Sequence, residues 1–451
     1  MKKNYIIDTN VLILDEDALF KFEDNDVYIP MAVVDEIDGL KNDYKNKDRA
    51  SSARAVNKNL RDILTDINNI SKNGNIIQKL ENGGSITFYN NYAKEDGFKN
   101  KEITPDWEII LTALDISRKY KKKPTILVTN DNGMANRAIA KYNLKVEEYK
   151  NPMITNVYEG RKILRDIDPN IIKKIRNNEY VSSDFINDIH PNEYFQLYGS
   201  NGDCVLSKES NGTIMPIRYN FDNMGKIKPI NVGQKFMVDS LLSDIDKNPL
   251  SIISGPAGTG KTFLALAGAL EKLYNNEIEQ ILLLRPNVMI DKNDAALPGD
   301  EQSKVDPLMR PYWDNLKDIL NNKGKDAKQT LENLIEEEKI RVESFSYIRG
   351  RSFSNTFIIC DESQNMLRKH MYGLMTRPGD NTKLVILGDP SSEQIDNTYV
   401  NEYNNGLVFA MNFTKDSKYT SQVKLYESES KRSNLVKELL EILKNEKIKT
   451  L

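Results

Sequence analysis

A glycine-rich octapeptide that ends in lysine and threonine carries the clearest chemical signal of the sequence. Its letters, GPAGTGKT, fit the phosphate-binding pattern G-x-x-x-x-G-K-[ST]. Apolar Ser251–Ile253 precedes it as a strand, and Phe263–Leu273 follows it as a helix rich in Ala and Leu. Glycines allow backbone N–H groups to turn toward phosphates, and the helix N-terminus adds its positive dipole. We therefore expect a site for ATP and Mg²⁺ formed by Gly255, Pro256, Ala257, Gly258, Thr259, Gly260, Lys261 and Thr262.

Carboxylates from two later strands are expected to complete this site. Lys261 would reach the β- and γ-phosphates, and Thr262 would bind Mg²⁺. Asp361 and Glu362 follow an apolar run that resembles a Walker B strand, so Asp361 would hold Mg²⁺ and Glu362 would position the attacking water. Asp389 follows another apolar run. Because ligands of open α/β sheets bind at the carboxyl ends of strands, we expect all three motifs at one sheet edge.

The C-terminal half resembles the PhoH-type ATPases, which are relatives of superfamily 1 helicases. The resemblance implies that Gln234 contacts the adenine side, that Gln394 senses the γ-phosphate, and that Arg432 acts on it. Three extra residues, Ser391–Glu393, separate Gln394 from the preceding strand end, which departs from the family pattern. The matching stretches, which cover most of residues 230–435, are LLRPNV (Leu283–Val288), LPGDEQSKVDPLMRPYWDNL (Leu297–Leu316), SYIRGRSFSN (Ser346–Asn355), DESQN (Asp361–Asn365) and EQIDN (Glu393–Asn397).

The number of P-loops bears on the oligomeric state. Superfamily 1 helicases place ATP between two tandem cores, and the second core supplies an arginine. This chain has one P-loop and one core. A complete site of that kind needs a neighbouring subunit, so we expect a homo-oligomeric ring in which Arg432 acts in trans. The resemblance suggests a hexamer.

Four carboxylates in the first 150 residues occupy comparable places at the ends of strands and in helices. They are Asp8, Glu36, Asp106 and Asp131. On spacing alone, helix-capping or solvated acids are an equal alternative. A parallel sheet gathers its strand ends, however, and clustered carboxylates stay ionised together only with a cation between them. All-oxygen ligands suit Mg²⁺ or Mn²⁺, which would activate water for phosphodiester hydrolysis.

The same segment resembles the PIN-domain nucleases. In that family the matching acids bind the metal, which extends to Asp8, Glu36, Asp106 and Asp131. Trp107 stands where a small polar residue is expected, which departs from the family pattern beside Asp106. The matching stretches are IIDTNVLI (Ile6–Ile13), VVDEIDGLK (Val33–Lys41), PDWEIILTAL (Pro105–Leu114) and VTNDNGMANRA (Val128–Ala138). A PIN domain ahead of a PhoH-type ATPase is itself a known arrangement of the family.

Three segments follow from the strand and helix patterns. Residues 1–150 are expected to form a PIN-like parallel-sheet α/β domain, with Asn68–Gly84 as an irregular loop. Residues 151–229 are a linker whose two Asn-Gly turns predict a small antiparallel β module. Residues 230–451 are a RecA-like α/β P-loop domain. Its expected strands are Leu250–Ile253, Gln280–Leu284, Arg341–Phe345, Thr356–Cys360, Lys383–Leu387 and Val423–Tyr426.

Composition narrows the chemistry and the compartment. The 451-residue chain carries a net charge of −3 and only two histidines, which disfavours histidine-based catalysis or metal binding. Its two cysteines lie far apart, as expected in a reducing compartment. No apolar run approaches about 18 residues, so no membrane span is expected. These features predict a cytoplasmic protein.

The sequence leaves three functions open. The first is an ATP-dependent RNA-processing protein that unwinds or threads single-stranded RNA and cuts it at the PIN site. The second is an ATPase regulator whose PIN domain binds RNA without cutting it. The third is a P-loop kinase for a small molecule, which Asp361, Glu362 and Gln394 disfavour because they suit hydrolysis.

Overall fold

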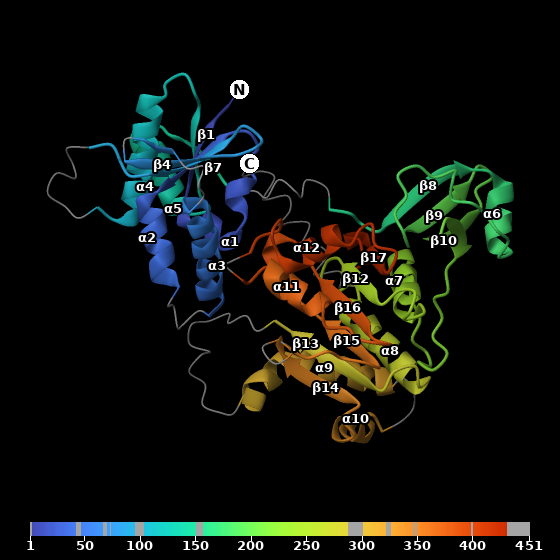
Figure 1. Ribbon diagram of the computed structural model, residues 1–451. Coiled ribbons are helices and arrows are strands. Elements are labelled where there is room, and N and C mark those ends of the chain that lie inside the picture. The colour runs from blue at the N-terminus through green and yellow to red at the C-terminus, as the bar shows by residue number, and fades with distance from the viewer. Residues whose placement is uncertain are drawn as a thin grey trace. The chain divides into compact units, whose positions relative to one another are not determined.

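The computed structural model forms two compact units, Met1–Met153 and Ile154–Leu451 (Figure 1). The structure describes residues 2–41, 47–65, 70–72, 74–94, 103–149, 157–286, 301–321, 326–345, 348, 350–397 and 400–430. Both units are α/β folds built on parallel sheets, which confirms the expected fold class. Among the described residues, no helix combines the length and the apolar character needed to cross a membrane.

The first unit is one sheet with the strand order β3-β4-β5-β2-β1-β6-β7. The five strands from β5 to β7 run parallel, and β3 and β4 pair antiparallel at one edge. The strands are β1 (Asn4–Ile7), β2 (Asp26–Pro30), β3 (Ile70–Lys72), β4 (Asn75–Lys79), β5 (Ser85–Tyr89), β6 (Thr125–Val128) and β7 (Lys145–Glu147). The helices are α1 (Thr9–Leu14), η1 (Ala18–Phe20), α2 (Met31–Leu40), α3 (Lys47–Leu64), α4 (Pro105–Lys119) and α5 (Asn132–Tyr142).

The expectation of an irregular loop at Asn68–Gly84 was wrong. The segment contributes β3 and β4, which turn at Gly74 with a φ of +76° and pair with each other. Alternation of apolar and polar residues is weak in these short edge strands, and the Asn-rich composition obscured it. The apolar run Tyr5–Leu14 also divides into β1 and α1.

A four-stranded module begins the second unit, with the strand order β11-β10-β9-β8. Its strands are β8 (Arg161–Ile167), β9 (Tyr194–Gly199), β10 (Cys204–Ser210) and β11 (Thr213–Pro216), and α6 (Pro169–Arg176) packs against it. The antiparallel strands β9 to β11 confirm the hairpins that the Asn-Gly turns predicted. Strand β8 adds to β9 in parallel.

The second unit centres on a six-stranded sheet with the order β14-β13-β15-β16-β12-β17, in which all strands run parallel. These strands match the six expected from the sequence within a few residues. They are β12 (Leu250–Ser254), β13 (Gln280–Arg285), β14 (Ile340–Ser344), β15 (Thr356–Cys360), β16 (Lys383–Gly388) and β17 (Thr420–Lys424). The helices are α7 (Val232–Leu242), α8 (Lys261–Tyr274), α9 (Glu301–Asn321), α10 (Ala327–Glu336), α11 (Arg368–Met375) and α12 (Gly406–Phe413), with η5 (Ser363–Asn365), η6 (Ser392–Gln394) and η7 (Glu427–Glu429).

Helices cover both faces of this sheet (Figure 1). Alternate strand residues such as Ile359 and Val385 pack on α7 to α10, whereas Ile358 and Ile386 pack on α11 and α12. Apolar residues on both faces explain why each strand is a continuous apolar run. The phosphate-binding loop lies at the carboxyl-terminal edge of this sheet. Because helices pack on both faces, the strands that position the loop are held in place.

Candidate functional site

The phosphate-binding loop joins the end of β12 to the start of α8. Its glycines adopt positive φ, +145° at Gly255, +79° at Gly258 and +86° at Gly260. At Gly255 a Cβ would lie 2.5 Å from the carbonyl oxygen of Leu425, so no other residue fits without movement of the neighbouring chain. The conformation that turns the backbone around a phosphate therefore depends on these glycines.

The loop brings a cation and a metal-binding pair together. The Lys261 ammonium donates hydrogen bonds to the carbonyl oxygens of Gly255 and Pro256, at 2.6 and 3.0 Å. The Thr262 hydroxyl donates a 2.6 Å hydrogen bond to Oδ2 of Asp361, which follows β15. Two oxygens that suit Mg²⁺ thus lie within hydrogen-bond distance of each other beside the lysine.

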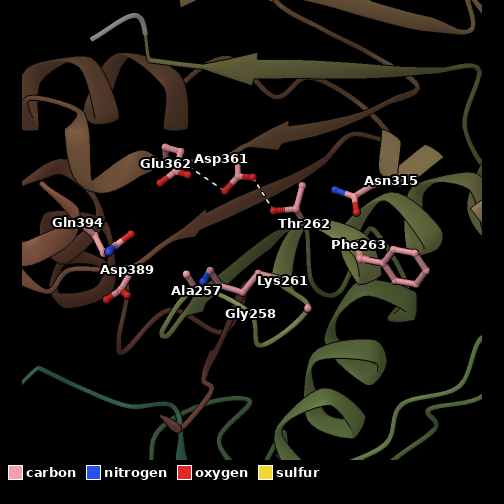
Figure 2. Close-up of a pocket in the computed structure, with 11 residues that line it drawn as sticks. Ala257, Gly258, Lys261, Thr262, Phe263, Asn315, Asp361, Glu362, Asp389 and Gln394 are labelled. Atoms are coloured by element: carbon pink, nitrogen blue, oxygen red, sulfur yellow. Dashed lines mark hydrogen bonds between the residues drawn. The ribbon is translucent and has the colours of Figure 1, made fainter. Parts of the chain in front are cut away.

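One cavity collects the residues expected at this site, and Figure 2 shows them around it. Asp389 and Gln394 enter it from the loop that follows β16. Two lining residues, Phe263 on α8 and Asn315 on α9, were given no role from the sequence, although Asn315 lies within one of the matching stretches. The complete lining is Ala257, Gly258, Gly260, Lys261, Thr262, Phe263, Asn315, Asp361, Glu362, Asp389 and Gln394.

Both carboxylate oxygens of Glu362 are held by neighbours. Arg285, at the end of β13, donates from Nη2 to Oε1 at 3.2 Å, and Gln364 donates from Nε2 to Oε2 at 2.7 Å. Glu362 itself has a φ of +53°, an unusual backbone conformation for a residue other than glycine. Strained residues of this kind persist where surrounding contacts fix them, and they cluster at functional sites.

Gln364 connects the two carboxylate-bearing loops. Its side chain is fully buried, and besides Glu362 it donates to the carbonyl oxygen of Gln394 at 3.0 Å. Its Oε1 accepts from the backbone N–H of Asp389 at 3.2 Å. Gln364 belongs to the DESQN stretch, but its role was not predicted because these contacts exist only in the folded sheet.

The remaining residues expected at the nucleotide lie differently. Gln234 is buried outside the cavity lining, where its Nε2 donates to the carbonyl oxygen of Thr259 at 3.0 Å and its Oε1 accepts from the N–H of Ile230. It therefore braces the phosphate-binding loop from behind. Arg432 lies outside the described residues.

In the first unit, Asp8 lies between β1 and α1 and is almost fully buried. The pKa of its carboxyl is raised to about 6, mainly by burial and to a smaller extent by the nearby charges of Glu36 and Asp106. A 2.6 Å hydrogen bond from the Thr129 hydroxyl lowers the pKa in part. Glu36 and Asp106 are thus each close enough to Asp8 for their charges to affect it.

Each of the other three acids has a protein partner. The Thr9 hydroxyl donates to Glu36, and Arg137 donates from Nη2 to Asp106 at 2.6 Å. Asp131 caps α5 and accepts from the N–H groups of Gly133 and Met134 at 2.6 and 3.1 Å. Thr9, Thr129 and Arg137 were not predicted, although Thr9 and Thr129 stand beside the acids in the motifs.

These acids repel one another when they are charged, and a bound metal ion would offset that repulsion. In the described part of the chain, no three His, Cys, Asp or Glu side chains are arranged to hold a metal ion together. A buried carboxyl with a raised pKa beside two further carboxylates is nonetheless where a divalent cation would stabilise the charged form. Asp8, Glu36 and Asp106 therefore fit such an ion by chemistry, and Asp131 would join them from the start of α5.

Comparison with known proteins yields two family matches and several relatives. Residues 5–150 match the family described as PIN domain, and residues 226–444 match the family described as PhoH-like protein. The Protein PhoH2 of Bacillus subtilis (strain 168) is 32% identical over 98% of this chain and 100% of its own length. A PhoH-like protein of Synechocystis is 34% identical over 46% of this chain and 61% of its own. A second protein of Bacillus subtilis, also named PhoH-like protein, is 37% identical over 48% of this chain and 63% of its own.

Proposed function

The chain belongs to the PhoH-like proteins with an N-terminal PIN domain, and from this premise we propose that it couples ATP hydrolysis to unwinding or translocation of RNA, which the PIN domain cuts. The observation that carries the proposal is the single cavity lined by Lys261, Thr262, Asp361, Glu362 and Gln394. It combines a phosphate-binding loop with a carboxylate placed for water activation, and this combination suits hydrolysis better than transfer to a small molecule.

The chain's own residues divide the ATPase chemistry among them. Lys261 and the loop N–H groups hold the β- and γ-phosphates, and Thr262 and Asp361 hold Mg²⁺, whose charge offsets that of the phosphates. Glu362 orients the attacking water and receives its proton. Gln394 senses the γ-phosphate.

Two neighbours fix the position of Glu362. The contacts from Arg285 and Gln364 hold its carboxylate against the sheet edge. Because Gln364 also contacts the backbone of Gln394, a shift of the γ-phosphate sensor passes to the water-activating carboxylate through one buried amide. Gln234 supports the loop through the carbonyl oxygen of Thr259. We also propose that Gln234 contacts the adenine side of the nucleotide.

The nuclease half of the proposal rests on the acids of the first unit. Asp8, Glu36, Asp106 and Asp131 would bind Mg²⁺ or Mn²⁺, and the ion would activate water and stabilise the leaving oxygen. Thr129 orients Asp8 by its hydroxyl and accepts from the N–H of Asp131, so it links two of the proposed ligands. The Thr9 hydroxyl likewise donates to Glu36 and orients its carboxylate.

One observation favours the alternative in which the PIN domain binds RNA without cutting it. Arg137 neutralises Asp106, and the Asp131 carboxylate is engaged by the N-terminus of α5. Binding of a metal by all four acids requires Asp106 to exchange this arginine for the ion. A domain that keeps the ion pair would retain a surface for RNA and lack the full ligand set.

Assembly completes the proposal. One core with one phosphate-binding loop leaves the ATP site open to a neighbouring subunit, and a closed ring of identical subunits supplies one to every site. We place Arg432 in that role, on the transition-state charge of the adjacent subunit's ATP, and six subunits as the number.

The experiment that tests the proposed function measures ATP hydrolysis by the purified full chain with and without single-stranded RNA, and analyses the same RNA for fragments. RNA-stimulated hydrolysis with metal-dependent fragments supports the full proposal. Stimulation without fragments, in Mg²⁺ and in Mn²⁺, selects the binding-only alternative. A rate of ATP hydrolysis that RNA does not change contradicts both the proposal and the alternative.

A further inference from the structure

A tryptophan flanked by two cations lies at the edge of the first unit. Trp107 belongs to the first turn of α4, and Arg137 and Lys141 belong to α5. The Arg137 guanidinium carbon lies 5.6 Å from the centre of the indole ring, and the Lys141 ammonium lies 4.7 Å from it. Because Arg137 and Lys141 are four residues apart on one helix, they share a face of α5.

The three side chains are open to solvent to different degrees. Trp107 is partly buried against the core of the unit, the Arg137 side chain is 37% exposed, and Lys141 is exposed. Packing alone accounts for the buried part of the indole. It gives no reason for two cations over an aromatic ring that reaches the surface, where such contacts contribute little to stability.

This cluster adjoins the proposed nuclease acids. Trp107 directly follows Asp106, and Asp106 pairs with Arg137 at 2.6 Å. The charge of Asp106 acts in turn on Asp8. The aromatic ring and its two cations therefore border Asp106, one of these acids.

We propose that Trp107, Arg137 and Lys141 form a platform that binds single-stranded RNA beside the PIN site. One base stacks on the indole ring where the two cations lie in the free protein, and the guanidinium and the ammonium turn to the phosphates on either side. Aromatic stacking accepts every base, and cations attract the backbone without regard to sequence, so the platform binds many sequences. This inference rests on the proposed function and names the surface through which the first unit takes RNA.

Charge and chemistry together select the occupant. An acidic protein segment would offer the two cations negative charge alone, whereas a nucleic-acid strand supplies both a flat base for the ring and phosphates for the cations. The residue that departs from the family pattern after the third acid is thus the one that contacts the base. A small polar residue at position 107 would leave the two cations without that ring.

Tryptophan fluorescence reads this contact directly, because the chain contains only Trp107 and Trp313. In a Trp313→Phe background all tryptophan emission comes from Trp107. We expect single-stranded oligouridine to quench this emission as it binds the full chain. Anisotropy of a labelled copy of the same RNA measures total binding independently, including any at the ATPase unit.

Variants then separate the platform from packing. Lys141→Gln weakens the binding that quenching reports. Trp107→Ala and Trp107→Phe lack the reporting indole, so their binding is measured by anisotropy, and we expect the first to weaken it by about tenfold or more and the second by much less. Lys141→Gln also lowers the slope of log affinity against log salt by about one. Lys122→Gln is the matched control, since Lys122 is exposed beyond the other end of α4 and should change neither quantity.

Two results would overturn the platform in distinguishable ways. RNA that binds by anisotropy but neither quenches Trp107 nor responds to Lys141→Gln places the RNA elsewhere, so the platform fails and the proposed function stands. Absence of any RNA binding by anisotropy removes both. Because the Lys141 side chain is exposed, its substitution should leave the fold intact. A change in RNA binding by this variant therefore reports the lost charge.

Discussion

Thr262 and Asp361 are 99 residues apart in the chain, yet the hydroxyl of one donates a 2.6 Å hydrogen bond to the carboxylate of the other. The contact exists because β12 and β15 end at the same edge of a parallel sheet, with β16 between them. It joins the start of α8 to the strand that carries Glu362. Lys261, Glu362 and Gln394 of the proposed ATP site lie around this pair in one cavity.

Lys261→Ala should abolish ATP turnover while the fold persists. The substitution removes the ammonium that compensates the β- and γ-phosphates, and loss of one preorganised charge contact costs about a hundredfold or more in rate. ATP hydrolysis and thermal unfolding of the two proteins measure the two effects. A variant that hydrolyses ATP at the wild-type rate would refute the role given to Lys261.

Gln364→Leu tests the buried connection between the two carboxylate loops. The substitution leaves the Asp389 N–H and the Gln394 carbonyl without their buried partner and frees one oxygen of Glu362. We expect a loss of about 1–3 kcal/mol in the free energy of unfolding for the unsatisfied groups, measured by denaturant titration.

Turnover separates this role from a purely structural one. In Gln364→Leu, kcat should fall while the affinity for ATP stays near wild type, because the amide does not touch the phosphate-binding loop. Gln234→Leu is the contrasting variant, since Gln234 contacts the loop at Thr259 and should weaken ATP binding. Equal losses of affinity in both variants would contradict the separate roles.

Asp8→Asn and Asp131→Asn should separate the two active sites. Each removes one ligand charge from the proposed metal site and nothing from the ATP site, so RNA cleavage with Mg²⁺ or Mn²⁺ should fall by about a hundredfold or more. ATP hydrolysis should remain. If wild type and the double variant cut RNA equally, the fragments come from a contaminating nuclease or the PIN domain only binds RNA.

Mixed assemblies test the proposed ring. Arg432→Ala subunits keep Lys261, and Lys261→Ala subunits keep Arg432, so neither homomer should hydrolyse ATP. Assemblies that contain both should regain activity wherever an intact Lys261 meets an intact Arg432, because an arginine supplied in trans is worth about a thousandfold or more. Full activity in a strictly monomeric preparation would rule the ring out.

The strands and the phosphate-binding loop were predictable because each carries a local signal. Continuous apolar runs mark strands buried on both faces, and the spacing of the glycines and Lys261 marks the loop. The paired strands β3 and β4 escaped prediction because they are short and polar. The strand β8 escaped because its pairing with β9 depends on the docked module and not on its own pattern.

The features that could not be predicted from the sequence are contacts between segments that lie far apart in the chain. The ion pair of Asp106 with Arg137 joins two helices through residues that are 31 positions apart, and no spacing rule predicts it. The same holds for Arg285 and Glu362, 77 residues apart, and for the buried amide of Gln364. Motifs identified which residues meet, whereas the partners that hold them in place came from the fold.

The central claim is that this cavity hydrolyses ATP in response to RNA. Its most direct test compares ATP turnover by wild type and Glu362→Gln, each with and without single-stranded RNA. We predict that RNA stimulates the wild type, and that Glu362→Gln binds ATP with wild-type affinity yet hydrolyses it slowly with or without RNA, because only water activation is lost. Turnover by Glu362→Gln at the wild-type rate, or wild-type turnover that RNA leaves unchanged, would contradict the claim.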